Sequence, residues 1–209
     1  MYKLYYSAGS CSMSIHAILN ELGQKFELVD ANQPGTKTRT AEFLKISPRG
    51  TVPVLEIDGT PIHEGGAIIT YLCDTHESAL LPKSGMARAK ALEALMFCNA
   101  TLHPAYSRAF GAMKQADPAV KEMLLAAAAE NINKLWAEVD GKLGQRKYLA
   151  GDAITAGDIL MTVIANWSGA FGEAIKIGPN VKRVISEIKS RPAFQKALQT
   201  ESVDYKVAA

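Results

Sequence analysis

The feature that most constrains the fold is a proline-led hairpin followed at once by a helix start, within residues 51–72. Val54–Ile57 and Thr60–Ile62 are short β-type runs, and Asp58-Gly59 between them suits a two-residue turn that needs positive φ. Pro53 stands where the leading strand begins, a place where proline is tolerated and a cis bond can form. The pattern therefore predicts a bend at Pro53 and a hairpin after it.

This stretch also predicts a slot for a small extended peptide. With a cis bond before Pro53, the N–H and C=O of Val52 are expected to point outward, where a peptide can add by main-chain hydrogen bonds. The next helix begins near Gly65 and Gly66, which bring no side chain to cover its first N–H groups. Such a helix start attracts an anion, so the peptide should carry a carboxylate at one end.

The elements around the hairpin complete one α/β domain. Lys3–Ser7 predicts a first strand, an amphipathic helix then runs to Gly23, and Phe26–Val29 predicts a second strand. Ala41–Ile46 reads as a short helix before the hairpin. The resulting order β-α-β-α-β-β-α matches a thioredoxin-like domain.

Beyond residue 78 the chain becomes helical in pattern and rich in alanine. We expect a thioredoxin-like domain over residues 1–78, a linker over 79–85 and an all-helical domain over 86–209. Residues 86–113 and 118–143 each predict one long helix.

A capping box marks the start of a core helix in this second half. Thr155 and Asp158 have the Ser/Thr-x-x-acid spacing directly before an apolar run, so Asp158 is assigned to folding rather than catalysis. A closing helix is expected after Arg191, with Pro192 in its first turn.

Charge, apolar runs and cysteine content argue against several classes of function. The net charge is +2 with no block of like charge, which disfavours nucleic-acid binding and anionic membranes. No apolar run approaches the roughly 20 residues of a membrane span, so a cytoplasmic protein is expected. The three cysteines form no metal-ligand pattern, and no metal is expected. Cys73 and Cys98 fall in helical patterns and are interpreted as small core residues.

Thr51-Val-Pro-Val-Leu55 followed by Glu64-Gly-Gly-Ala-Ile68 resembles the glutathione-binding signature of the glutathione S-transferase superfamily. The capping box and the closing helix also match, so the resemblance covers nearly the whole chain. It implies the fold of that family, with glutathione as co-substrate and a homodimer as the assembly.

The resemblance also assigns glutathione contacts to individual residues. Val52, before the expected cis Pro53, would pair with the cysteinyl backbone of glutathione, and Glu64 and Gly65 would hold its γ-glutamyl end. Many members carry serine where Gly65 stands, so only the N–H remains there. The glycyl carboxylate needs a cation, for which Lys37 is the candidate, with Arg39 as the alternative.

The catalytic candidates follow the first strand. Tyr6-Ser-Ala-Gly-Ser-Cys-Ser12 resembles the bacterial beta-class transferases, in which a cysteine at this point can form a mixed disulfide with glutathione. Cys11 lies at a helix start, where we expect N–H groups and the helix dipole to lower its pKa. Thr101-Leu-His103 resembles the helix histidine of that class, so His103 is expected near the glutathione sulfur.

The same long helix supplies candidates for the second substrate. Some beta-class members carry lysine and asparagine where this chain has Pro104 and Met96, which puts the electrostatics at the sulfur in doubt. Helical spacing places five residues on one face, which we expect to line a pocket for a small hydrophobic electrophile: Met96, Asn99, His103, Tyr106 and Phe110. Ordinary packing is the alternative for Met96 and Phe110.

Three functions remain open on the sequence alone. The first is a glutathione S-transferase that conjugates the glutathione thiolate to small hydrophobic electrophiles. The second is a glutathione-dependent thiol-disulfide oxidoreductase or peroxidase that uses Cys11. The third is a binding or regulatory member of the fold with no significant turnover.

Overall fold

The computed structural model describes residues 1–207, whose contacts form two compact units. The first unit combines Met1–Lys83 with Lys189–Asp204, and the second contains Ser84–Ile188 and the described residues 205–207. The expected division placed Lys189–Asp204 in the helical domain, whereas the contacts return this segment to the first unit. The reason is packing of the closing helix on the first one, which no local pattern reveals.

A four-stranded sheet in the order β2-β1-β3-β4 forms the base of the first unit. Strand β1 pairs parallel with β2 and antiparallel with β3, and β3 pairs antiparallel with β4. The predicted thioredoxin-like order is confirmed. The strands are β1 (Tyr2–Tyr6), β2 (Phe26–Asp30), β3 (Val54–Ile57) and β4 (Thr60–His63).

The hairpin has the turn that its sequence predicts. Asp58 and Gly59 have φ values of 48° and 85°, the left-handed conformation that a two-residue primed turn requires. The turn therefore fixes the register in which Val54 faces His63 and Ile57 faces Thr60.

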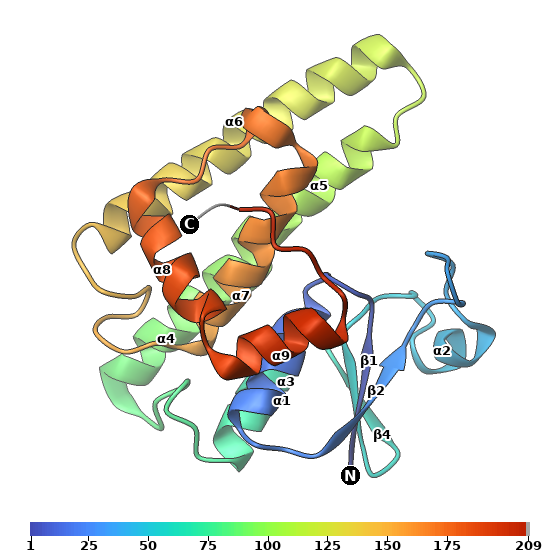
Figure 1. The fold of residues 1–209 in the computed structure, drawn as a ribbon, viewed down its shortest axis with the longest axis vertical. Coiled ribbons are helices and arrows are strands. Elements are labelled where there is room, and N and C mark those ends of the chain that lie inside the picture. Colours follow the sequence, from blue (N-terminus) through green and yellow to red (C-terminus); the bar gives the residue numbers. More distant parts are fainter. Residues whose placement is uncertain (208–209) are drawn as a thin grey trace. The chain divides into compact units, whose positions relative to one another are not determined.

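Helices cover both faces of this sheet (Figure 1). Alternation along β1 sends Tyr5 toward α2 (Ala41–Ile46), where it packs with Phe43 and Val54 in one apolar cluster. On the other face lie α1 (Ser12–Glu21) and α3 (Gly65–Thr75), which pack against each other. Helix α9 (Pro192–Thr200) packs on α1, with Pro192 in its first turn as predicted.

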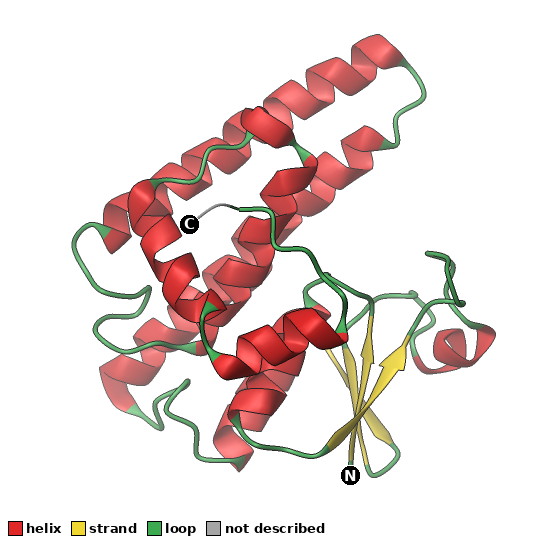
Figure 2. Cartoon of the chain, in the orientation of Figure 1, coloured by secondary structure: helices red, strands yellow, loops and turns green. Residues whose placement is uncertain are grey.

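The described part of the second unit consists of helices joined by loops and turns, with no β-strand (Figure 2). Helix α5 packs along α6, and α4 along α7. Its longer elements are α4 (Gly85–Phe97), α5 (His103–Met113), α6 (Pro118–Leu143), α7 (Ala156–Asn166) and α8 (Pro179–Lys189). Shorter turns are the π-helical η1 (Cys98–Leu102) and the 3-10 turns η2 (Trp167–Ala170) and η3 (Gly172–Ala174).

The expectation of one uninterrupted helix over residues 86–113 is wrong in one turn. Cys98–Leu102 is π-helical, and the N–H of His103 donates to the C=O of Cys98, five residues back. Pro104 has no N–H to give to an α-helical ladder, and its ring would crowd the carbonyl one turn earlier. A widened turn removes that conflict and shifts the face that the following residues present.

Helix α7 is the buried centre of the second unit. The capping box is present as predicted: the Asp158 carboxylate accepts from the Thr155 N–H at 2.8 Å and from the Leu149 N–H at 2.9 Å. A Cβ on Gly157 would lie 3.0 Å from the backbone of Ala94. Glycine therefore lets α7 approach α4 at the backbone level.

Candidate functional site

The bend at Pro53 sets one side of the site in the first unit. The Val52-Pro53 bond is cis, and Val52 stands half-buried just before β3. The C=O of Val52 was expected to be unpaired, but the Cys11 thiol donates to it at 3.5 Å. The predicted nucleophile and the predicted peptide-binding residue therefore lie side by side.

Glu64 and Gly65 form a second part of the same unit. Glu64 has φ 69° and ψ 113°, a region that residues with a Cβ rarely occupy and that tends to persist at functional sites. It stands as the N-cap of α3 and makes no side-chain cap, so the first N–H groups of the helix are not covered by its carboxylate. That carboxylate turns outward to Arg49, at 3.0 Å.

Cys11 is the N-cap of α1, as the sequence predicts, but its pKa moves in the opposite direction from the expectation. Burial raises the pKa of the thiol to about 11, and this outweighs the backbone N–H groups of Cys11 and Ser12 and the charge of Arg39, which all lower it. Desolvation penalises the thiolate more than the helix start stabilises it. Cys11 is therefore a protonated thiol at neutral pH.

The serines beside Cys11 bond within their own loop. Ser12 is fully buried, and its hydroxyl lies 2.8 Å from that of Ser10 and accepts from the Ser7 N–H at 3.2 Å. Burial raises the pKa of the Tyr6 phenol, with the charge of Asp30 adding to it. Among these groups, Ser10 is half-buried and its hydroxyl can reorient.

Arg39 is a cation that the structure orders near this loop. Its guanidinium donates to the Gly50 C=O at 2.8 Å and to the Asn32 side chain at 2.6 Å, and Asn32 donates to the Ser7 hydroxyl at 3.0 Å. Lys37 lies exposed in the preceding turn. Sequence reasoning missed Asn32, whose only signal is its place two residues after the second strand.

In the second unit, a cluster of rings gathers three of the five predicted pocket residues. His103, Tyr106 and Phe110 lie within 5.0, 5.8 and 6.3 Å of the Trp167 ring, measured between centroids. Phe171 lies 5.2 Å from Phe110. We call these five residues the aromatic cluster. Sequence reasoning missed Trp167 and Phe171, whose spacing of four was the available signal.

Met96 and Asn99 precede the change of register at the π-helical turn. Met96 is 39% exposed near the end of α4, and Asn99 lies within the turn itself. Their predicted alignment with the aromatic cluster assumed an α-helical period across residues 98–102, where the structure has a wider one.

Burial gives the members of the aromatic cluster different chemical roles. Burial lowers the pKa of His103, so its imidazole is neutral at pH 7. The Tyr106 phenol is buried, accepts from the Trp136 indole at 2.8 Å and lies 2.5 Å from the Ser168 hydroxyl. Burial raises the pKa of Tyr106 to about 12, and its bonds hold the ring in place.

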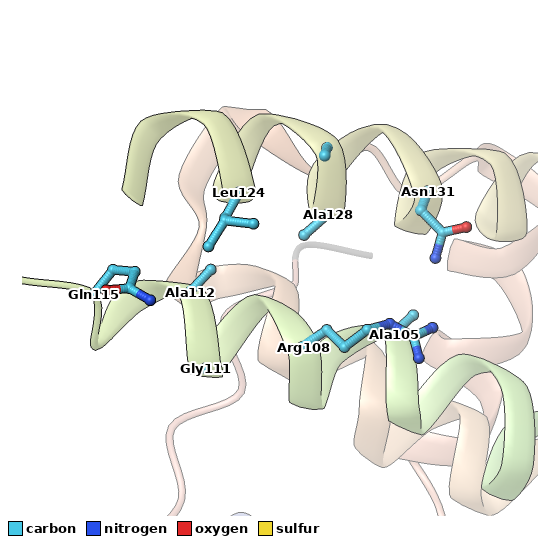
Figure 3. A pocket seen from close by; sticks show the side chains of 9 residues that line it. Ala105, Arg108, Gly111, Ala112, Gln115, Leu124, Ala128 and Asn131 are labelled. Atoms are coloured by element: carbon cyan, nitrogen blue, oxygen red, sulfur yellow. The ribbon is translucent and has the colours of Figure 1, made fainter. Parts of the chain in front are cut away.

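A groove of about 620 Å³ runs between α5 and α6. In Figure 3, the side chains of Leu124 and Ala112 point toward each other across it, and Arg108 and Asn131 reach into it further along. None of the predicted pocket residues lines this groove. A second groove along α6, of about 570 Å³, includes Phe171 of the aromatic cluster.

No helix between residues 1 and 207 is long and apolar enough to cross a membrane. Over the same residues, no three histidine, cysteine or acidic side chains gather as metal ligands would.

Comparison with known proteins decides the family. Residues 4–80 match the model of the glutathione S-transferase N-terminal domain, and residues 95–192 match that of the C-terminal domain. Glutathione S-transferase GST-4.5 of Xanthomonas campestris is 30% identical over 97% of this chain and 100% of its own. The chain belongs to the glutathione S-transferase family.

Further relatives of this glutathione S-transferase family member differ in what their names describe. A sphingomonad glutathione S-transferase, solved in complex with glutathione, superposes with a TM-score of 0.83 at 31% identity, covering 97% of this chain and 100% of that one. A maleylacetoacetate isomerase of Dictyostelium discoideum is 25% identical over 95% of this chain and 93% of its own.

Proposed function

We propose that this protein binds glutathione in its first unit and conjugates the glutathione thiolate to small hydrophobic electrophiles. The observation that carries the proposal is the Glu64 backbone, which holds a left-handed conformation at the start of α3 and leaves the first N–H groups of that helix without a side-chain cap. A γ-glutamyl group matches this arrangement, because its carboxylate can accept from the N–H groups of Gly65 and Gly66 and its ammonium can pair with the Glu64 carboxylate.

The remaining contacts follow from the same unit. The N–H and C=O of Val52 would pair with the cysteinyl backbone of glutathione, beside Pro53, and the Cys11 thiol would give up its bond to the Val52 C=O when the peptide binds. A cation would hold the glycyl carboxylate. We propose Arg39 for this role ahead of Lys37, because Arg39 is ordered by Asn32 and Gly50.

Conjugation requires the protein to bind the two substrates and to stabilise the glutathione thiolate. The glutathione thiol loses its proton to solvent, its sulfur forms a bond to the electrophilic carbon, and the leaving group departs with the electron pair. We propose that the aromatic cluster receives apolar, planar electrophiles, because His103, Phe110 and Trp167 present partly exposed rings. His103 keeps the role that the resemblance implies, donation to the glutathione thiolate, and this too is a proposal.

Conjugation is favoured over redox chemistry at Cys11 by one observation. A thiol whose pKa is raised to about 11 is a poor nucleophile near pH 7. A second candidate function is glutathione-dependent isomerisation, which the isomerase among the relatives brings into consideration. The two reactions differ in an observable way, because isomerisation consumes no glutathione.

The proposal is tested with wild type and two variants, Glu64→Ala and Arg49→Ala. Glutathione binding is measured by calorimetry, and turnover with 1-chloro-2,4-dinitrobenzene by the absorbance of the conjugate. We expect Glu64→Ala to weaken glutathione binding at least tenfold, since it removes a charge-assisted contact. Arg49→Ala is the matched control: the Arg49–Glu64 pair is exposed and adds little stability, so its loss should leave binding unchanged or tighter.

Two results would contradict the proposal. Wild type that binds no glutathione would remove its basis. Wild type that binds glutathione but consumes none with aryl halides, epoxides or peroxides would favour isomerisation, checked with maleylacetoacetate, or the binding role. The proposed homodimer is tested by sedimentation, which should give about twice the 22.5 kDa mass of one chain.

A further inference from the structure

Glu201 is the C-cap residue that follows α9, and its side chain is buried in the first unit. Its Oε1 lies 2.8 Å from Nδ1 of His16 in α1, and its Oε2 accepts from the Gly9 N–H at 3.0 Å. The side chains of Glu201 and His16 are 0% and 2% exposed. One carboxylate therefore joins the end of α9 to α1 and to the loop that precedes α1.

A buried carboxylate such as that of Glu201 adds little net stability to a protein. Removing an ionisable pair from water is costly, and replacing both partners by apolar residues of similar size often leaves a protein as stable as before. What the carboxylate supplies is two oxygens with fixed directions, each meeting a separate donor.

The loop that Glu201 holds carries the candidate nucleophile. Gly9 has φ 69°, and a Cβ there would lie 3.5 Å from a methyl group of Val203. The chain just after α9 therefore covers Gly9 by packing as well as by the Glu201 hydrogen bond. Two residues further on, Cys11 reaches the C=O of Val52.

We infer that Glu201 is a positioning residue, which fixes the loop Ser7–Cys11 and so sets where Cys11 stands. The placement of the loop does not depend on the proposed function. Its effect on glutathione binding does rest on that proposal, so the two are measured separately.

A second ionic contact between the same helices supplies the control. Arg191 donates to both oxygens of Glu21 at 2.6 and 2.7 Å, joining the start of α9 to the last turn of α1. This contact lies at the end of α1 that is farther from the loop Ser7–Cys11. A variant at Glu21 therefore weakens the packing of α1 and α9 without releasing the loop.

The experiment compares the rate at which iodoacetamide alkylates Cys11 and Cys73 in wild type, Glu201→Leu, Glu201→Gln and Glu21→Leu, read by peptide mass. Glu201→Leu offers no acceptor to Gly9, and we expect alkylation of Cys11 to rise about tenfold with Cys73 unchanged. Glu201→Gln should restore the wild-type rate, because its amide oxygen can serve Gly9 while its NH2 serves the other tautomer of His16. Glu21→Leu should change neither thiol selectively.

Equal acceleration at Cys11 and Cys73 would overturn the inference, since it would mean general opening of the first unit. Unchanged alkylation of Cys11 in folded Glu201→Leu would also overturn it. If that variant does not fold, hydrogen exchange on wild type decides: we expect the Gly9 amide to be protected to within about tenfold of the α1 amides, and an unprotected Gly9 contradicts the inference.

Calorimetry with glutathione forms a separate arm. Wild type that fails to bind glutathione refutes the proposed function and leaves the alkylation result standing. Weaker binding in Glu201→Leu with selective alkylation of Cys11 supports both.

Discussion

The thiol of Cys11 should be nearly unreactive in the free protein at neutral pH. Burial raises its pKa from 9.0 to about 11. At pH 7, about 1 molecule in 10,000 then carries a thiolate at Cys11, against about 1 in 100 for an exposed cysteine, and only the thiolate attacks an alkylating agent. The alkylation rate should therefore be about a hundredfold below that of a small reference thiol with a pKa near 9.

The assay follows iodoacetamide alkylation between pH 7 and pH 10 by intact mass, with Cys11→Ala to identify the adduct. Because Cys11 titrates only near pH 11, the rate should rise about tenfold per pH unit across the whole range. Cys73 and Cys98 are buried in their helices and serve as internal references. A rate that levels off below pH 9 would refute the reasoning, because it would show a thiolate stabilised by the start of α1.

Because folding raises the pKa of Cys11, the free energy of unfolding depends on pH. The folded protein holds the Cys11 proton more tightly than the unfolded chain does, since the folded pKa is the higher one. The stabilisation from this group is therefore complete below about pH 9 and is lost as the pH rises toward 11. Cys11→Ala should lose less stability than wild type over this window in urea titrations.

Three other predictions follow from the second unit. Asp158→Ala leaves the buried Leu149 and Thr155 N–H groups without an acceptor and should lower the free energy of unfolding in urea by roughly 2–6 kcal/mol. Asp117→Ala, at the exposed cap of α6, should lower it by about 1 kcal/mol. Equal losses in the two variants would contradict the assignment of Asp158 to folding. Phe110→Ala should raise KM for an aryl electrophile several-fold while Met96→Ala leaves it unchanged, and the reverse order would exclude the aromatic cluster as the pocket. His103→Asn should lower kcat without weakening glutathione binding; because burial lowers the pKa of His103, any loss of wild-type kcat from its protonation should appear only below about pH 6.5 in the pH–rate profile.

Local patterns in the sequence predicted most of the first unit. The Asp58-Gly59 turn, the start of α3 at Gly65 and the cap at Cys11 depend on neighbouring residues only, so a chain that carries them has few alternatives. The capping box at Thr155 likewise depends on neighbouring residues only. The family resemblance rested on these same stretches, and the comparisons confirm it.

The remaining features of the fold and of the candidate site depended on residues far apart in the chain. Helix α9 belongs with the first unit because Glu201 meets His16 across 185 positions, and no periodic pattern records such a contact. The π-helical turn before His103 altered a face that simple helical spacing had predicted. Trp167 joined the aromatic cluster by packing against rings about 60 positions earlier in the chain.

The pKa of Cys11 shows most clearly what the sequence determined and what the tertiary structure decided. The sequence by itself determined that a cysteine stands at the start of a helix, and a helix start alone lowers a thiol pKa. Only the tertiary structure decided how far Val52 and the neighbouring chain exclude water from that thiol. Desolvation depends on everything packed around a group, and here it outweighs the local field, so the sign of the shift was not available from the sequence.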